Sequence, residues 1–153
     1  MAEIKKIDKE KVDKYLKKWQ NKLRLKDWDL KIHLVEQSWR KTGDIKIDTE
    51  NKMAVVMLNN FNPYSDNWEA IIVHELMHLK LWGLDQMIEK LIYNVFDSEE
   101  DPGFQIAYND FMMELETTAE DFTKSFIALG GKNKKLNFGR VEKQVKKELN
   151  QTN

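Results

Sequence analysis

The sequence predicts an α+β fold in which one helix comes first, three short strands follow, and helices make up the rest. Apolar residues recur at helical spacing near both ends of the 153-residue chain. Between residues 28 and 58 the apolar pattern changes to the alternation typical of strands. No internal repeat or large shift of composition divides the chain. We therefore expect a single domain over residues 1–131 and a Lys-rich tail with a short helix over residues 132–153.

The first half of the chain should form one helix and the sheet. Apolar residues at helical spacing predict an amphipathic helix over residues 8–25. Strands are indicated at 30–34, at 45–47 after Gly43, and at 53–58. The last of these runs is the most apolar and should be the most deeply buried. If it also forms a sheet edge facing the site described below, it can pair with a peptide.

The second half should be helical. Asp66 and Glu69 resemble a capping box at the start of a helix that Gly83 ends. A shorter helix is expected over 84–96, then an acidic loop, then a long helix from Phe104 to Leu129. The apolar residues of the tail have the spacing of a last amphipathic helix. They are Phe138, Val141, Val145 and Leu149.

Composition limits the classes of function. The 25 Lys and Arg nearly balance the 26 Asp and Glu, so charge gives no clear signal for a nucleic-acid partner. The chain has no Cys, which excludes disulfides and thiolate metal sites, so a transition metal must be held by His and carboxylates. No signal-like or membrane-spanning run is found. We expect a cytoplasmic protein without a membrane partner.

Residues 74–78 read His-Glu-Leu-Met-His, the H-E-x-x-H pattern, inside an expected helix. Residues four apart lie one turn apart on one helix face, so His74 and His78 can reach the same metal ion. Zinc favours such nitrogen ligands. Glu75 can reach the metal's water without binding the ion and act as general base. The alternative to a metal site is that the pattern arose by chance on an ordinary amphipathic helix. It is weakened because two of the only three His have this spacing.

A catalytic zinc site needs a third protein ligand and an open position for water. No His follows His78, and His33 lies on an expected strand, where it is better explained as a solvent-facing residue. The third ligand should therefore be a carboxylate. Glu116 and Glu120 share one face of the long helix, so one can bind the metal while the other orients a His. Glu116 is the preferred ligand, and the alternative is that all these carboxylates are surface charges.

The two motifs together are similar to those of gluzincins, in which H-E-x-x-H is followed tens of residues later by E-x-x-A-D/E. Here the second motif is Glu116-Thr117-Thr118-Ala119-Glu120. With the strand ahead of the motif helix and Phe122 in an E-x-x-A-x-x-F pattern, residues 28–127 resemble the compact phage and mobile-element peptidases of the ImmA/IrrE type. Glu120 stands where many gluzincins have Asp.

This resemblance implies a zincin-like fold. A small sheet of three or slightly more strands would pack on the active-site helix and on the long helix near the C-terminus. It also implies that Zn²⁺ is bound by three side chains, those of His74, His78 and Glu116.

We therefore expect a zinc metallopeptidase, a hydrolase of peptide or protein substrates in which Glu75 activates the attacking water. Two alternatives stay open. One is a zincin-fold binding or regulatory protein that retains zinc without efficient proteolysis. The other is a SprT-like protease acting on DNA-bound proteins, although such proteases normally use a downstream His. Tyr64 and Tyr108 are candidates for stabilising an oxyanion, but each is more simply a packing or surface residue.

Overall fold

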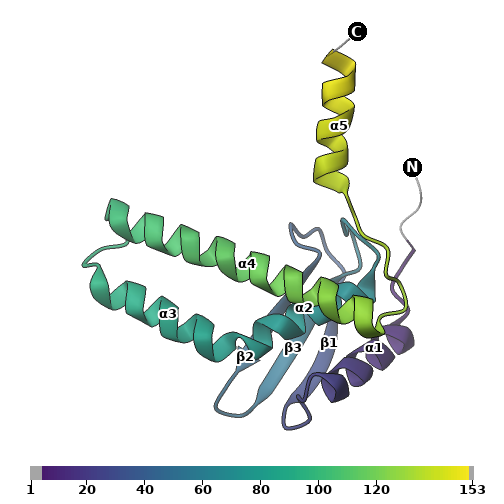
Figure 1. Ribbon diagram of the computed structural model, residues 1–153. Coiled ribbons are helices and arrows are strands. Elements are labelled where there is room, and N and C mark those ends of the chain that lie inside the picture. Colours follow the sequence, from purple (N-terminus) through teal and green to yellow (C-terminus); the bar gives the residue numbers. More distant parts are fainter. Residues whose placement is uncertain (1–4, 152–153) are drawn as a thin grey trace.

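The computed structural model describes residues 5–151 and has the α+β architecture expected from the sequence (Figure 1). Within these residues five helices and three strands follow one another in the order α1 Lys9–Lys22, β1 Asp29–Val35, β2 Gly43–Asp48, β3 Met53–Asn59, α2 Trp68–Lys80, α3 Trp82–Val95, α4 Pro102–Gly130 and α5 Gly139–Gln151. Among the described residues, no helix combines the length and apolar character needed to span a membrane.

The three strands form one mixed sheet in the order β1-β3-β2. β3 pairs in parallel with β1 and antiparallel with β2, so Val56 lies between Ile32 and Ile45. The expectation that β3 forms a sheet edge is therefore wrong. Its continuous apolar run suits a central strand, which is buried by neighbours on both sides. The edge that lies against α2 belongs to β2.

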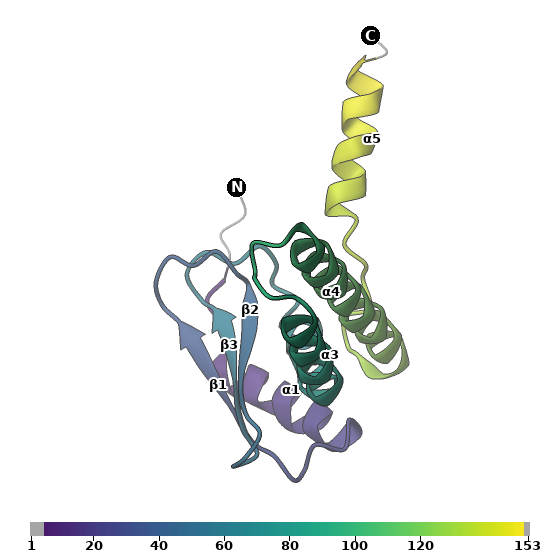
Figure 2. The same ribbon diagram turned by 90° about the vertical axis from the view of Figure 1, so that its left-hand side faces the viewer.

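Only one face of the sheet is covered by helices, as Figure 2 shows. α1 packs on β1 and α2 packs on β2, and the two helices contact each other. Ile32 and Val56 point to this covered face and are buried. The alternation of side chains along a strand places His33 and its neighbour Met57 on the opposite face. The core therefore lies between the sheet and the first two helices.

The start of α2 differs from the expected capping box. Its N-cap is Asn67, whose side chain accepts a hydrogen bond from the Ala70 N–H, so Asp66 is not the cap. Glu69 does not turn back to the cap. Its carboxylate is buried and accepts hydrogen bonds from three donors of distant segments: the Lys18 Nζ at 2.6 Å, the Trp19 Nε1 at 2.9 Å and the Lys132 N–H at 2.8 Å. A buried indole N–H needs an acceptor, and Glu69 supplies it.

The end of α2 also differs from the prediction. The helix ends at Lys80 with Leu81 as its C-cap, and Gly83 lies inside the first turn of α3. Because Leu81 is also the N-cap of α3, the two helices join with almost no loop.

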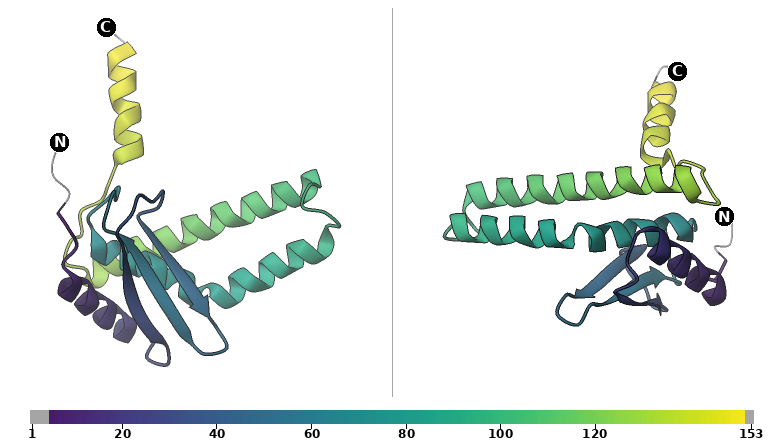
Figure 3. Two further views of the ribbon diagram at one scale, coloured as in Figure 1. Left: turned by 180° about the vertical axis from the view of Figure 1, so that it is seen from behind. Right: turned by 60° about the horizontal axis from the view of Figure 1, so that its bottom comes forward.

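α3 and α4 form an antiparallel hairpin that extends beyond the sheet (Figure 3). α4 begins at Pro102, earlier than the expected Phe104, because Asp101 accepts a hydrogen bond from the Gly103 N–H and caps the helix. Proline at the first helical position loses no hydrogen bond there. α5 stands away from the rest of the molecule, and none of its residues is buried.

Candidate metal centre

Most residues of α2 are buried, and the less buried side of the helix that carries the two His faces α4. Ile72, Val73, Leu76, Met77 and Leu79 are all at most 4% exposed. The two His of the motif occupy the remaining side, and their side chains are 18% and 14% exposed. Burial of the apolar residues therefore orients both imidazoles toward α4, which packs against α2.

α4 presents its carboxylates to these imidazoles through a row of buried residues spaced by four. The row consists of Leu115, Ala119, Thr123 and Ile127. Ala119 is fully buried, and its small side chain lets α4 approach closely. Glu116 and Glu120 each follow a member of this row by one residue, so they lie at the margin of the contact between the two helices.

Three side chains converge at this margin. The His74 Nε2 lies 3.2 Å from the His78 Nε2, and both are close to the carboxylate of Glu116, at 3.2 and 3.0 Å respectively. Two ligands about 2.0–2.1 Å from a tetrahedral metal lie about 3.3–3.4 Å apart. The group formed by His74, His78 and Glu116 can thus hold one metal ion with only small adjustments.

Glu120 contacts the other nitrogen of His74. Its Oε2 lies 2.9 Å from the Nδ1, which leaves the Nε2 directed at the cluster. A carboxylate in this position fixes the orientation of a metal-binding imidazole and increases its basicity. Glu120 thus lies where it can orient His74, which is one of the two roles expected for the pair formed by Glu116 and Glu120.

The carboxylates beside His74 favour the protonated, positively charged form of its ring. Burial of the ring opposes protonation, but hydrogen bonds to Glu116 and Glu120 outweigh it and raise the pKa of His74 to about 10. The hydrogen bonds from His74 and His78 lower the pKa of Glu116, although its partial burial opposes this. The pKa of Glu120 is lowered mainly by its bond to His74. The two carboxylates therefore favour a positive charge at this group.

Glu75 lies beside this group but outside it. Its side chain is buried, and burial raises the pKa of Glu75 to about 7, with Asp44 and Glu116 adding to the rise and the two imidazoles opposing it. A carboxylate with a pKa near neutrality can both accept and return a proton under ordinary conditions.

Gly43, at the start of β2, was not recognised from the sequence as part of the site. A Cβ added there would lie 2.7 Å from the Ile71 Cγ2 and 3.1 Å from the Glu75 Oε1. The backbone of β2 therefore passes so close to α2 that any side chain at residue 43 would press on Ile71 and Glu75. Glycine within a strand is the sequence signal for such a close approach.

β2 offers an open strand edge at this point. The Asn59 N–H donates to the carbonyl of Thr42, so the N–H of Gly43, on the same peptide unit, points away from β3. The next outward N–H, that of Ile45, is bonded to the Asp44 carboxylate at 2.9 Å.

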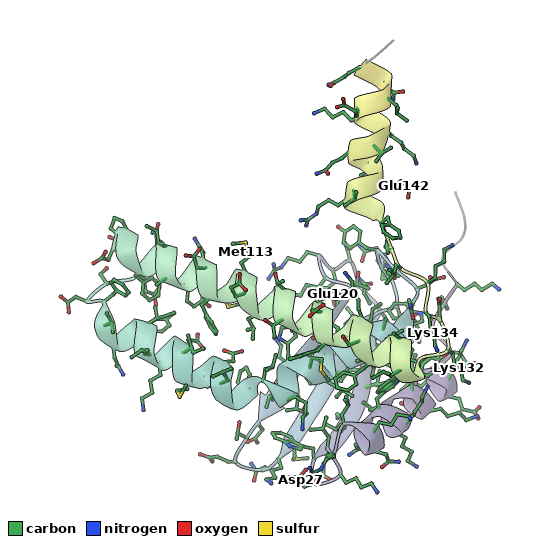
Figure 4. The ribbon with its side chains drawn as sticks, in the orientation of Figure 1. Asp27, Met113, Glu120, Lys132, Lys134 and Glu142 are labelled. Carbon is green, nitrogen blue, oxygen red and sulfur yellow. The ribbon has the colours of Figure 1, made fainter. Side chains whose placement is uncertain are left out.

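A cleft of about 910 Å³ runs from the metal-binding group toward the tail. His74 and Glu75 line one end, next to Gly43. Glu120 on α4, Lys134 on the segment after α4 and Glu142 at the base of α5 belong to its walls and are labelled in Figure 4. This volume lies in the range of clefts that bind small molecules.

Other candidates from the sequence lie elsewhere. His33 is exposed on the uncovered face of the sheet and is not brought to the cluster. Tyr108 stacks on Phe104 at a ring-centroid distance of 5.7 Å and takes part in an aromatic cluster of the α3–α4 hairpin. Tyr64 is 80% exposed, and neither tyrosine lines the cleft.

Comparison with models of protein families, with curated proteins and with solved structures gave no significant match to this chain.

Proposed function

We propose that this protein is a zinc-dependent peptidase of the gluzincin kind, with His74, His78 and Glu116 as metal ligands and Glu75 as general base. The observation that carries the proposal is the convergence of two imidazole nitrogens, 3.2 Å apart, on the carboxylate of Glu116, whose Oε2 lies 3.2 Å from the His74 Nε2 and whose Oε1 lies 3.0 Å from the His78 Nε2. A buried carboxylate stands immediately beside them.

The donor set favours zinc. Two nitrogens and one carboxylate, without sulfur, are a common ligand set of catalytic zinc, which leaves a fourth position open. Zinc bound there would act as a Lewis acid and lower the pKa of a coordinated water. The carboxylate of Glu120 supports this assignment, since orienting partners of this kind accompany metal-binding His.

Glu75 supplies proton transfer. Its raised pKa, about 7, suits a group that takes a proton from the attacking water and passes it to the leaving amine. Burial also keeps bulk water away from the carboxylate, which strengthens its interaction with the reacting atoms.

The open edge of β2 supports a peptide as the substrate. An extended chain can pair with a strand edge through its backbone, and this mode of binding does not depend on a particular sequence. Gly43 brings that edge against Glu75, so a peptide paired there would lie beside the proposed catalytic group. The edge strand of the sheet that can pair with a peptide beside the site is thus β2, because β3 is central.

The experiment compares the protein with its Glu75→Gln variant in zinc content and in cleavage of a mixed peptide library. We expect about one zinc per chain in both proteins and a loss of at least ~10²-fold in turnover in the variant. Equal cleavage by the two proteins would contradict the role of Glu75. Zinc retained without cleavage by either would favour a zincin-fold binding protein that lacks efficient proteolysis.

A further inference from the structure

α3 carries an exposed apolar stripe on the side of the hairpin that faces solvent. Its members recur at positions i, i+3, i+7 and i+11, the spacing of a single helix face. They are Leu84, Met87, Leu91 and Val95, and each is between 52 and 63% exposed. Four large apolar side chains in one continuous line exceed the scattered exposure that is normal for a protein surface.

α5 carries a second stripe with the same spacing. Its members are Phe138, Val141, Val145 and Leu149, and each is also between 52 and 63% exposed. Phe138 directly precedes the helix, and its carbonyl accepts a hydrogen bond from the Glu142 N–H of the first turn. The two stripes therefore have equal length and the same arrangement of apolar side chains.

The two segments have opposite charge. Residues 82–113, which include α3 and the tip of the hairpin, contain seven Asp or Glu and one Lys. Residues 131–151, which include α5, contain seven Lys or Arg and two Glu. The chain is nearly neutral as a whole, so this separation of charge is local. Such complementarity fixes the choice of partner and speeds association.

We propose that α5 of one copy packs its apolar stripe on the α3 stripe of a second copy, and that the exchange is reciprocal. Within one chain α4 lies between α3 and α5, as Figures 1 and 3 show. The hydrogen bond between Lys132 and Glu69 holds the start of the tail, which leaves only residues 133–138 as a connection. Six residues span at most about 20 Å. Two identical contacts related by a twofold axis close a dimer.

The test measures the oligomeric state of the full chain by light scattering and sedimentation at low and high salt. We expect a mass of about twice 18.2 kDa that falls toward the monomer as salt is raised. Val145→Asp and Leu91→Asp should each weaken the dimer by at least about 100-fold, because each puts a charge in an apolar contact. Gln144→Asp makes the same change of charge beside the α5 stripe but outside the apolar contact, so it should weaken the dimer far less than Val145→Asp. A monomeric wild type, or equal dimerisation of Val145→Asp and Gln144→Asp, would overturn the proposal.

A mixture of the two weakened variants distinguishes exchange between copies from packing within one chain. Neither variant alone can form an intact contact between α5 and α3. Mixed together, Leu91→Asp supplies an intact α5 and Val145→Asp supplies an intact α3. We expect dimers in the mixture that each variant alone lacks. No gain on mixing would refute the reciprocal exchange.

Discussion

Glu116 and Glu114 lie two residues apart on α4 but differ in what they contact. Only Glu116 approaches the imidazoles, and both carboxylates are exposed enough to be replaced without loss of core packing. We expect Glu116→Gln to weaken zinc binding by at least about tenfold. Loss of a residue that merely orients a ligand already costs about 10–100-fold in metal affinity, and loss of a ligand should cost no less. Glu114→Gln should bind zinc like the wild type. Zinc affinities from competition with a chelator check this. An unchanged affinity in Glu116→Gln would move the third ligand to Glu120.

Zinc binding should release a proton from His74. The pKa of His74 is raised from 6.5 to about 10 in the metal-free protein, so the ring is protonated at neutral pH and must lose its proton to bind metal. Zinc affinity should therefore rise about tenfold per pH unit between roughly pH 7 and 10, and calorimetry in buffers of different ionisation enthalpy should find about one proton released per zinc at pH 7.

Folding stability should depend on pH in the opposite direction to zinc affinity. A raised pKa means that the proton on His74 stabilises the metal-free fold fully below pH 6.5, and that this contribution is lost as the pH rises through about 10. In Glu120→Gln one of the two carboxylates that hold this proton is neutral, so proton release at pH 7 should decrease. Zinc binding without any proton release would show that His74 is neutral in the metal-free protein.

At the scale of elements, β2 positions Glu75 through Gly43. In Gly43→Ala the new methyl group would press on Ile71 and on the Glu75 carboxylate. We expect turnover to fall by about 10–100-fold, as small displacements of a catalytic group commonly cause, while zinc stoichiometry stays the same. Gly83→Ala is the matched control, since an added Cβ at Gly83 meets nothing within 4 Å. If both variants cleave peptides equally well, β2 does not hold Glu75 in place.

Local spacing explains what could be predicted from the sequence. A four-residue separation places His74 with His78, and Glu116 with Glu120, whatever the rest of the fold does. The contact between Glu120 and His74 also needs α4 to pack against α2, which local spacing does not determine.

The errors concern features that depend on distant partners. The sequence predicts Glu69 as a capping residue, but its carboxylate accepts a hydrogen bond from the indole of Trp19, which lies fifty residues earlier in the chain. The strand order likewise could not be predicted from the local pattern. The apolar run of β3 suits a central strand, but it equally suits an edge strand that is covered by another element.

For the whole molecule, the core does not depend on the metal. The buried cluster between the sheet, α1 and α2 includes Trp19, Val56 and Leu76 but none of the proposed ligands. Removal of metal by a chelator should therefore leave the circular dichroism spectrum and cooperative unfolding intact. Zinc should add about 2.7 kcal/mol at a free concentration of 100 times its dissociation constant. Unfolding by the chelator, as in zinc fingers, would contradict this.

The hydrogen bond from the Lys132 backbone to the buried Glu69 carboxylate sets where the chain can be shortened. Composition places the end of the domain at residue 131, and a cut there removes a donor from an anion that is only 2% exposed. A protein ending at residue 131 should lose about 1–3 kcal/mol of stability relative to one ending at residue 136. Limited proteolysis should therefore trim the tail more readily after Asn133 than before Lys132.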